Sequence, residues 1–252
     1  MLRIDSPGGS ALASEEILRE LDLFRETGKP LIVSMGSVAA SGGYWIAVAA
    51  EEIWASPATL TGSIGVGSAA PSFDRALARL GINIDGLGTT ELAGQMDPFQ
   101  GIGEDIAQYL QLTVEQTYAT FVTRIADRRA LEPDEVYASA EGRVWIGTEA
   151  LNRGLVDRLG ELPEAIESAA TLAGLEPGSY QVDRLEPELG WADQLLLQLA
   201  RVAAPVLPVF GVEPVLPASV ERLLDIATEP LAFLDQFNDP RGIYVYCFCD
   251  VD

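Results

Sequence analysis

The sequence has no histidine, a single lysine (Lys29) and only two cysteines, Cys247 and Cys249, among its 252 residues. Without histidine, a Ser-His-Asp triad and the common zinc sites are excluded. Two cysteines separated by one residue rarely form an unstrained disulfide, so we interpret this pair as structural or incidental. We expect no metal and no cofactor.

Basic residues are also few. The chain has 16 lysines and arginines against 38 acidic residues, a formal net charge of -22. Nucleic acid is therefore not an expected partner, because binding to phosphates needs a basic surface. No apolar run reaches the roughly 18 to 20 residues that span a bilayer, since prolines interrupt the apolar segment 202–218. The sequence opens directly on a short apolar strand with no signal peptide, which suggests a fragment or the rear half of a longer polypeptide.

Strand and helix patterns alternate along the first two thirds of the chain. Apolar residues at three- and four-residue spacing predict helices, and short apolar runs predict buried strands. The expected helices are 12–25, 42–50, 73–80, 102–129, 148–152 and 162–173. The expected strands are 2–5, 31–35, 52–55, 61–66 and 83–87, with a small-residue turn at 36–40. This alternation predicts an α/β fold with a largely parallel sheet.

From Gly174 onward prolines become frequent and the alternation stops. We therefore predict two parts: a domain over residues 1–173 and a C-terminal extension over 174–252 that makes packing or oligomer contacts.

Ser41 lies in the run A-A-S-G-G-Y-W, between a predicted strand and a predicted helix. A serine at this place either caps the helix or acts as a nucleophile on a tight turn. The small neighbours leave room for a substrate, and backbone N–H groups nearby are suited to bind an oxyanion. A serine nucleophile needs a base, yet Lys29 lies in a polar turn, where lysines are usually solvated.

Two further glycine-containing segments accompany this serine. In S-P-G-G, Gly8 and Gly9 either present N–H groups to a substrate carbonyl or form an ordinary turn after the first strand. In T-G-S-I-G, Ser63 either orients an amine or sits between glycines that mark a β-bulge.

The order S-P-G-G, A-S-G-G-Y-W, T-G-S-I-G resembles the serine–lysine peptidases of the signal peptide peptidase A family, family S49. The segments V-W-x-G at Val144 and G-L-V-D at Gly154 fit as well, and F-N-D-P at Phe237 followed by cysteines resembles the C-terminal repeat of the long bacterial form. The resemblance implies a fold related to crotonase and Clp protease, a repeated β-β-α superhelix.

By this resemblance, Ser41 is the nucleophile, and Gly42 together with Gly8 and Gly9 forms the oxyanion hole. Ser63 holds the amine of the base. The stretch 87–99, where the short family form carries its lysine, contains none here. In the long form the N-terminal repeat supplies this lysine, so the isolated chain should be nearly inactive.

The resemblance further implies an endopeptidase that cleaves hydrophobic peptides, such as released signal peptides, with Tyr44 and Trp45 lining an apolar groove. It implies association with the bacterial inner membrane, a catalytic part on the periplasmic side, contact with the N-terminal repeat and a homo-oligomer, a tetramer in the family. The alternative is a truncated, non-catalytic module that assembles or binds peptides.

Overall fold

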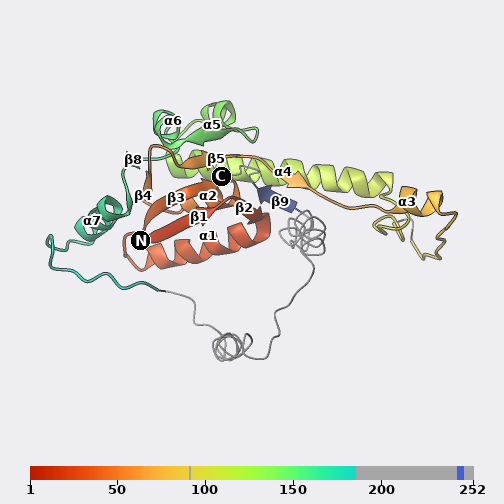
Figure 1. The fold of residues 1–252 in the computed structure, drawn as a ribbon, viewed down its shortest axis with the longest axis horizontal. Helices are drawn as coiled ribbons and strands as arrows, with labels where there is room; N and C mark the ends of the chain where they lie inside the picture. Colours follow the sequence, from red (N-terminus) through yellow and green to blue (C-terminus); the bar gives the residue numbers. More distant parts are fainter. Residues whose placement is uncertain (91, 186–242, 247–252) are drawn as a thin grey trace, which may run out of the picture. The chain divides into compact units, whose positions relative to one another are not determined.

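A six-stranded sheet forms the centre of the larger compact unit (Figure 1). The computed structural model describes residues 1–90, 92–185 and 243–246, and residues 1–178 together with the strand 243–246 belong to one compact unit. The strands follow the order β7-β5-β3-β4-β8, with β1 on the other edge of β3. They are β1 (Leu2–Ser6), β3 (Ile32–Ala40), β4 (Glu52–Ala55), β5 (Leu60–Gly62), β7 (Val144–Ile146) and β8 (Arg158–Leu159).

The long strand β3 organises this sheet, because β1, β4 and β5 all pair with it in parallel. Its first half pairs with β4, and its second half pairs with β5 through Val38↔Leu60 and Ala40↔Gly62. Only β7 runs antiparallel, alongside β5. The loops that follow β1, β3 and β5 therefore leave the sheet at the same edge.

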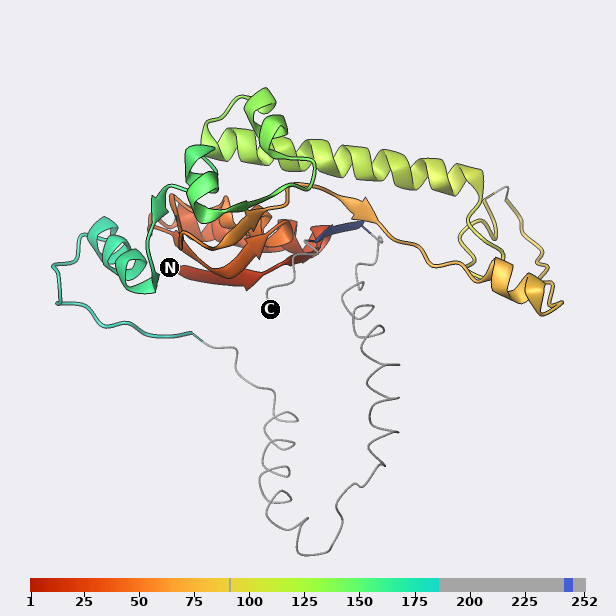
Figure 2. The same cartoon turned by 45° about the horizontal axis from the view of Figure 1, so that its top comes forward.

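The described residues form seven helices, of which α3 lies away from the sheet (Figure 1), and a second, three-stranded sheet. The small sheet has the order β2-β9-β6, with β2 (Gly8–Ser10), β6 (Gly67–Ser68) and β9 (Ile243–Tyr246). The helices are α1 (Ala11–Glu26), α2 (Gly42–Ala47), α3 (Asp74–Arg79), α4 (Glu104–Arg129), α5 (Pro133–Ser139), α6 (Gly147–Asn152) and α7 (Leu162–Leu172). Figure 2 shows α4 passing over the sheet.

The core lies between the sheet and the helices α1, α2 and α4. Leu18 of α1, Tyr44 and Trp45 of α2, and Phe121 and Ile125 of α4 are all buried. The rings of Trp45 and Phe121 stack with their centroids 4.4 Å apart. Because α2 is buried at the centre of these contacts, its first residue and the preceding Ser41 are held firmly.

The predicted α/β class is confirmed, and the helices α1, α4, α6 and α7 fall within two residues of their predicted bounds. The helix expected over 42–50 ends at Ala47, and the strand expected over 61–66 ends at Gly62. Two further local predictions were wrong. Residues 36–40 continue β3 instead of turning, because the carboxylate of Asp5 accepts the N–H of Val38 and fills the space beside Gly36. Residues 83–87 form no strand, since they lie apart from the sheet with Ile84 and Leu87 exposed.

The C-terminal part bears on two other predictions. The boundary near Gly174 stays a prediction, and most of the extension, with the apolar segment 202–218 and both cysteines, lies outside the described residues.

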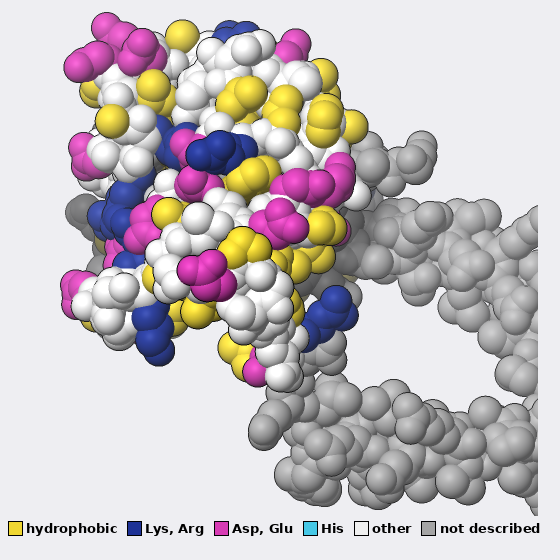
Figure 3. Space-filling view, turned by 90° about the vertical axis from the view of Figure 1, so that its left-hand side faces the viewer, with side chains coloured by type: hydrophobic (Ala, Val, Ile, Leu, Met, Phe, Trp, Pro, Cys, Tyr) yellow, Lys and Arg dark blue, Asp and Glu magenta, His cyan; other side chains and the backbone are white. Residues whose placement is uncertain are grey.

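Among the helices that the structure describes, none has both the length and the apolar composition of a bilayer span. The face drawn in Figure 3 mixes acidic and basic side chains with apolar ones.

Candidate active site

Ser41 connects β3 to α2 in a backbone conformation that residues other than glycine rarely adopt, with φ 53° and ψ -114°. Its N–H donates to the carbonyl of Gly62 at 2.8 Å, and its carbonyl accepts the N–H of Trp45 at 2.8 Å. Such a strained conformation persists only where the surrounding structure enforces it, and it is concentrated at functional sites.

The hydroxyl of Ser41 does not cap α2, so the capping interpretation was wrong. Ser41 is fully buried, and its Oγ has no hydrogen-bond partner among the residues that the structure describes. A buried polar group without a partner costs free energy and calls for an explanation. A hydroxyl that awaits a base and a substrate carbonyl provides one.

Ser63 lies beside Ser41. It follows β5 as Ser41 follows β3, and these two strands pair in parallel up to Ala40↔Gly62. Ser63 is buried, and its own φ is 49°. The hydroxyl of Thr61 donates to the carbonyl of Ala39 at 2.6 Å and joins the two strands just before the serines.

The Gly8–Gly9 segment reaches the same edge of the sheet from β1, whose last residue Ser6 pairs with Ala39. Gly8 and Gly9 have φ values of 118° and 153° and form β2 instead of a plain turn. Gly43, the second residue of α2, faces the end of β1. A Cβ on Gly43 would meet the carbonyl oxygen of Ser6 at 2.8 Å. The glycine thus allows the start of α2, with Gly42, to lie directly against this segment.

Four of the predicted site segments therefore come together: Ser41, Ser63, Gly42 and the loop of Gly8 and Gly9. Lys29 does not join them. It precedes β3, whose nine residues separate it from Ser41 by roughly 30 Å at about 3.3 Å per residue. Its ammonium group lies instead near the ring of Phe24, 6.0 Å from the centroid.

Tyr44 and Trp45 do not line a groove, contrary to the prediction. Tyr44 is fully buried and donates its hydroxyl to the carbonyl of Leu155 at 2.7 Å, and burial raises its pKa far above the ordinary value. Trp45 donates its indole N–H to Glu15 at 3.0 Å. Two consecutive aromatic residues after a run of small residues fit a buried helix as well as a groove.

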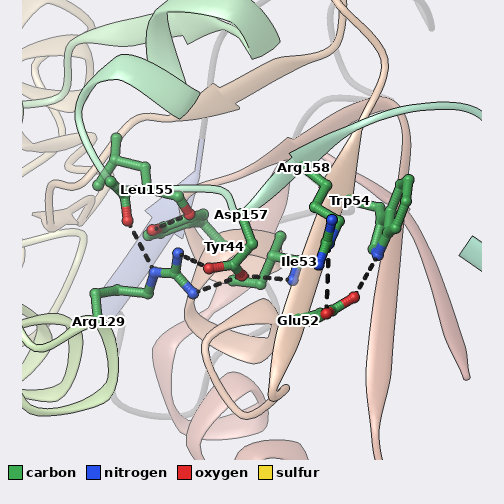
Figure 4. Close-up of polar contacts among 9 residues, drawn as sticks. Tyr44, Glu52, Ile53, Trp54, Arg129, Leu155, Asp157 and Arg158 are labelled. Carbon is green, nitrogen blue, oxygen red and sulfur yellow. Dashed lines mark hydrogen bonds and ion pairs between the residues drawn. The ribbon is translucent and has the colours of Figure 1, made fainter. Parts of the chain in front are cut away.

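Arg129 and Asp157 form a polar network close to α2, and only the segment G-L-V-D pointed to it in the sequence (Figure 4). Arg129 of α4 donates to both carboxylate oxygens of Asp157 at 2.7 and 2.9 Å and to the carbonyl of Gly154 at 2.9 Å. Asp157 also accepts the N–H of Ile53 in β4 at 2.7 Å. Helix, loop and strand are thus tied together next to the Tyr44 hydroxyl.

No three acidic or cysteine side chains of the described ranges gather in the way that metal ligands do. The chemistry that this arrangement offers is nucleophilic attack by a serine, with backbone N–H groups available for an oxyanion.

Comparison with known proteins gives consistent matches. The sequence pattern of peptidase family S49 matches residues 23–176. Protease 4 of Salmonella typhi is 37% identical over 247 residues, which make up 98% of this chain and 39% of that protein. The chloroplastic serine protease SPPA of Arabidopsis thaliana is 39% identical over 178 residues, 69% of this chain and 26% of that protein. This chain therefore spans less than half of each relative.

Among solved structures, a ClpP1 protein of Listeria monocytogenes aligns with a TM-score of 0.38 at 13% identity. The alignment covers 65% of this chain and 94% of that chain.

Proposed function

Since this chain belongs to peptidase family S49, we propose that it carries the serine nucleophile of a serine–lysine endopeptidase whose base comes from another polypeptide segment. The observation that carries the proposal is the strained, buried Ser41 with its unpartnered Oγ among the described residues, next to Ser63 and Gly8–Gly9. The name of the Arabidopsis thaliana relative, a serine protease, agrees with a serine nucleophile.

In the proposed reaction, Ser41 Oγ attacks the carbonyl carbon of the scissile peptide bond and its proton passes to a neutral lysine amine. The carbonyl oxygen becomes an oxyanion that the N–H groups of Gly42 and of the Gly8–Gly9 segment stabilise. Collapse of this intermediate expels the leaving amine, which takes the proton from the lysine. The lysine amine then takes a proton from a water molecule, which attacks the carbonyl carbon of the acyl group. The Ser41 Oγ leaves and recovers its proton from the lysine.

The base must come from outside this sequence, because Lys29 is the only lysine and lies at the far end of β3. The N-terminal repeat of a longer protein is the proposed source, in keeping with the 39% of Protease 4 that this chain covers. Ser63 then orients the amine. Burial next to the serine lowers the pKa of such a lysine toward neutrality, so that part of it is unprotonated.

We propose hydrophobic peptides, including released signal peptides, as substrates, and a location at the bacterial inner membrane with the site on the periplasmic side. A homo-oligomer of these chains, a tetramer by resemblance, is proposed as well. Exposed apolar side chains of the segment 73–102 support subunit contacts there, since patches of this kind mark interaction surfaces. They include Phe73, Leu80, Ile82, Leu87, Met96 and Phe99.

The test compares this chain alone with the same chain joined to a lysine-bearing partner repeat, on an unstructured apolar peptide. We expect turnover only in the joined protein, and a serine-directed acylating inhibitor should label Ser41 and no other serine. Label on a different residue, with full turnover in Ser41→Ala, would refute the proposal.

A second candidate, a non-catalytic peptide-binding module, is favoured for the isolated chain by the remote position of Lys29. It predicts peptide binding without turnover even after the partner repeat is added.

A further inference from the structure

The parallel strands β1 and β3 pair side by side, but their register shifts near the end of β1 (Figure 1). Ile4 pairs with Met35. Two residues later Ser6 pairs with Ala39, which lies four residues beyond Met35. The two extra residues of β3 lie within 36–38, which we call the β3 bulge. Bulges of this kind bend a strand and redirect the side chains that follow, and they are frequent next to active sites.

On its other edge, β3 changes partners at the same place. β4 pairs with residues 32–34, and β5 pairs with residues 38–40. Ser41 follows directly, so the geometry of the β3 bulge sets where the serine lies relative to β5. Because side chains alternate between the two faces of a sheet, a slip of one residue here would turn residues 38–40 over and displace Ser41 by about 3.3 Å.

Two side chains hold the β3 bulge from opposite edges. The Oδ1 atom of Asp5 in β1 accepts the N–H of Val38 at 3.1 Å. The hydroxyl of Thr59, the buried residue before β5, donates to the carbonyl of Gly36 at 2.8 Å. The same hydroxyl accepts the N–H of Ser56 at 3.1 Å. Side chains thus supply partners for backbone groups that a bulge takes out of ladder pairing.

Gly36 shows how closely Asp5 lies against the β3 bulge. A Cβ on Gly36 would meet the Cγ of Asp5 at 2.5 Å and its Cβ at 2.8 Å. Any larger residue would push the carboxylate away from the N–H of Val38. The glycine therefore permits the hydrogen bond that holds the bulge from the side of β1.

We propose that Asp5 and Thr59 are positioning residues of the peptidase, which act on Ser41 through the β3 bulge. The inference rests on the proposed function, because it takes Ser41 as the nucleophile. The Oγ of Ser41 must meet a substrate carbonyl and an amine at the same time, and a misplacement of about 1 Å can lower the rate roughly 100-fold. By holding the bulge, the two side chains fix the last residues of β3, and with them the N–H of Ser41 that donates to Gly62.

The first test measures the position of Ser41 without any chemistry, by amide hydrogen exchange of the full chain. In Asp5→Ala the N–H of Ser41 should exchange at least about tenfold faster than in the parent, while the N–H groups of residues 32–34, before the bulge, keep their rates. Asp5→Asn should restore the parent rate, because its amide oxygen also accepts the N–H of Val38. A parent-like rate at Ser41 in a folded Asp5→Ala would overturn the inference.

The second test uses the chain joined to a lysine-bearing partner repeat. A serine-directed acylating inhibitor should label Ser41 roughly 10- to 100-fold more slowly in Asp5→Ala and in Thr59→Val than in the parent, with the same labelled fraction at completion. In peptide turnover the loss should fall on kcat, with KM within about twofold of the parent. Asp5→Asn and Thr59→Ser keep the hydrogen-bonding atoms and should recover most of the rate.

Glu51→Ala is the matched control. The carboxylate of Glu51 accepts the N–H of Leu31 at 2.9 Å, a bond of the same kind as that of Asp5 but at the opposite end of β3 from Ser41. This variant should melt at a lower temperature without slower labelling. If it slows labelling as much as Asp5→Ala does, the effect is one of strand stability and the inference fails. If the parent itself is not labelled at Ser41, the proposed function fails, whereas hydrogen exchange still decides whether Asp5 positions Ser41.

Discussion

Ser41 and Ser63 occupy equivalent places on two neighbouring parallel strands. Each follows the last residue of its strand, each has a left-handed φ, 53° and 49°, and the N–H of Ser41 donates to the carbonyl of Gly62, the residue before Ser63. This backbone bond fixes the two hydroxyl-bearing residues side by side. The proposed function assigns them separate roles, nucleophile and orienter of the base, that substitutions can distinguish.

We predict that Ser41→Ala abolishes turnover in the reconstituted protein, whereas Ser63→Ala slows it by roughly 10- to 100-fold, within the range of general-base effects. The first variant removes the nucleophile, and the second leaves it but misorients the amine. Steady-state kinetics on an apolar peptide measure both. Equal losses in the two variants would contradict the division of roles.

We also predict that Lys29→Ala leaves turnover of the reconstituted protein within twofold of the parent, because roughly 30 Å of β3 separates the residue from Ser41. The pH–rate profile should rise with a lysine-like group whose pKa lies well below its free value of about 10.4. Loss of turnover in Lys29→Ala, with the melting temperature unchanged, would show that Lys29 is the base.

The strained backbone at Ser41 predicts that a glycine at this position stabilises the fold, although the nucleophile is lost. Ser41→Gly should be more stable than Ser41→Ala by about 1–2 kcal/mol, because glycine adopts this φ and ψ without a steric cost. Urea unfolding of the two inactive variants measures the difference. A Ser41→Gly variant less stable than Ser41→Ala would mean that the backbone is not strained there.

Gly43→Ala should destabilise the fold by about 1–3 kcal/mol, because its Cβ would meet the carbonyl oxygen of Ser6 at 2.8 Å. The contact is with backbone, so α2 would have to move away from β1. Gly86→Ala is the control, since its Cβ would meet the flexible end of the Gln100 side chain at 3.2 Å. Urea midpoints compare the two, and equal losses would refute the close approach of α2.

Glu52 predicts a defined response to acid (Figure 4). Burial alone would raise its pKa, but hydrogen bonds from Ser168 and Trp54 and the charge of Arg158 hold the pKa below the ordinary value of 4.5. A lowered pKa stabilises the fold above pH 4.5, and this contribution is lost as the pH falls through the pKa of the folded state.

Glu52→Gln should therefore melt at a lower temperature than the parent at pH 7, and the gap should narrow below pH 4.5. The exposed Glu20→Gln serves as a control and should show no such gap. A gap for Glu52→Gln that widens in acid would contradict the lowered pKa.

Local pattern was enough to predict α1, α4 and α7, since each helix places apolar residues at helical spacing on its buried face. It was also enough to single out Ser41, Ser63 and the Gly8–Gly9 segment. Local pattern could not predict contacts between distant segments of the chain. The sequence could not show that Asp5 would keep residues 36–40 extended, that Tyr44 would donate to Leu155, or that residues 243–246 would pair with β2.

The pairing of Gly8 with Tyr246 joins residues 238 positions apart (246 minus 8), against 31 for Leu2 with Val33 in the central sheet. Closing the larger loop costs about 2 kcal/mol more chain entropy. During refolding the central sheet therefore forms first and β9 joins last. A refolding chain passes through a stage in which the central sheet is built while β2 and β6 still lack the strand that joins them.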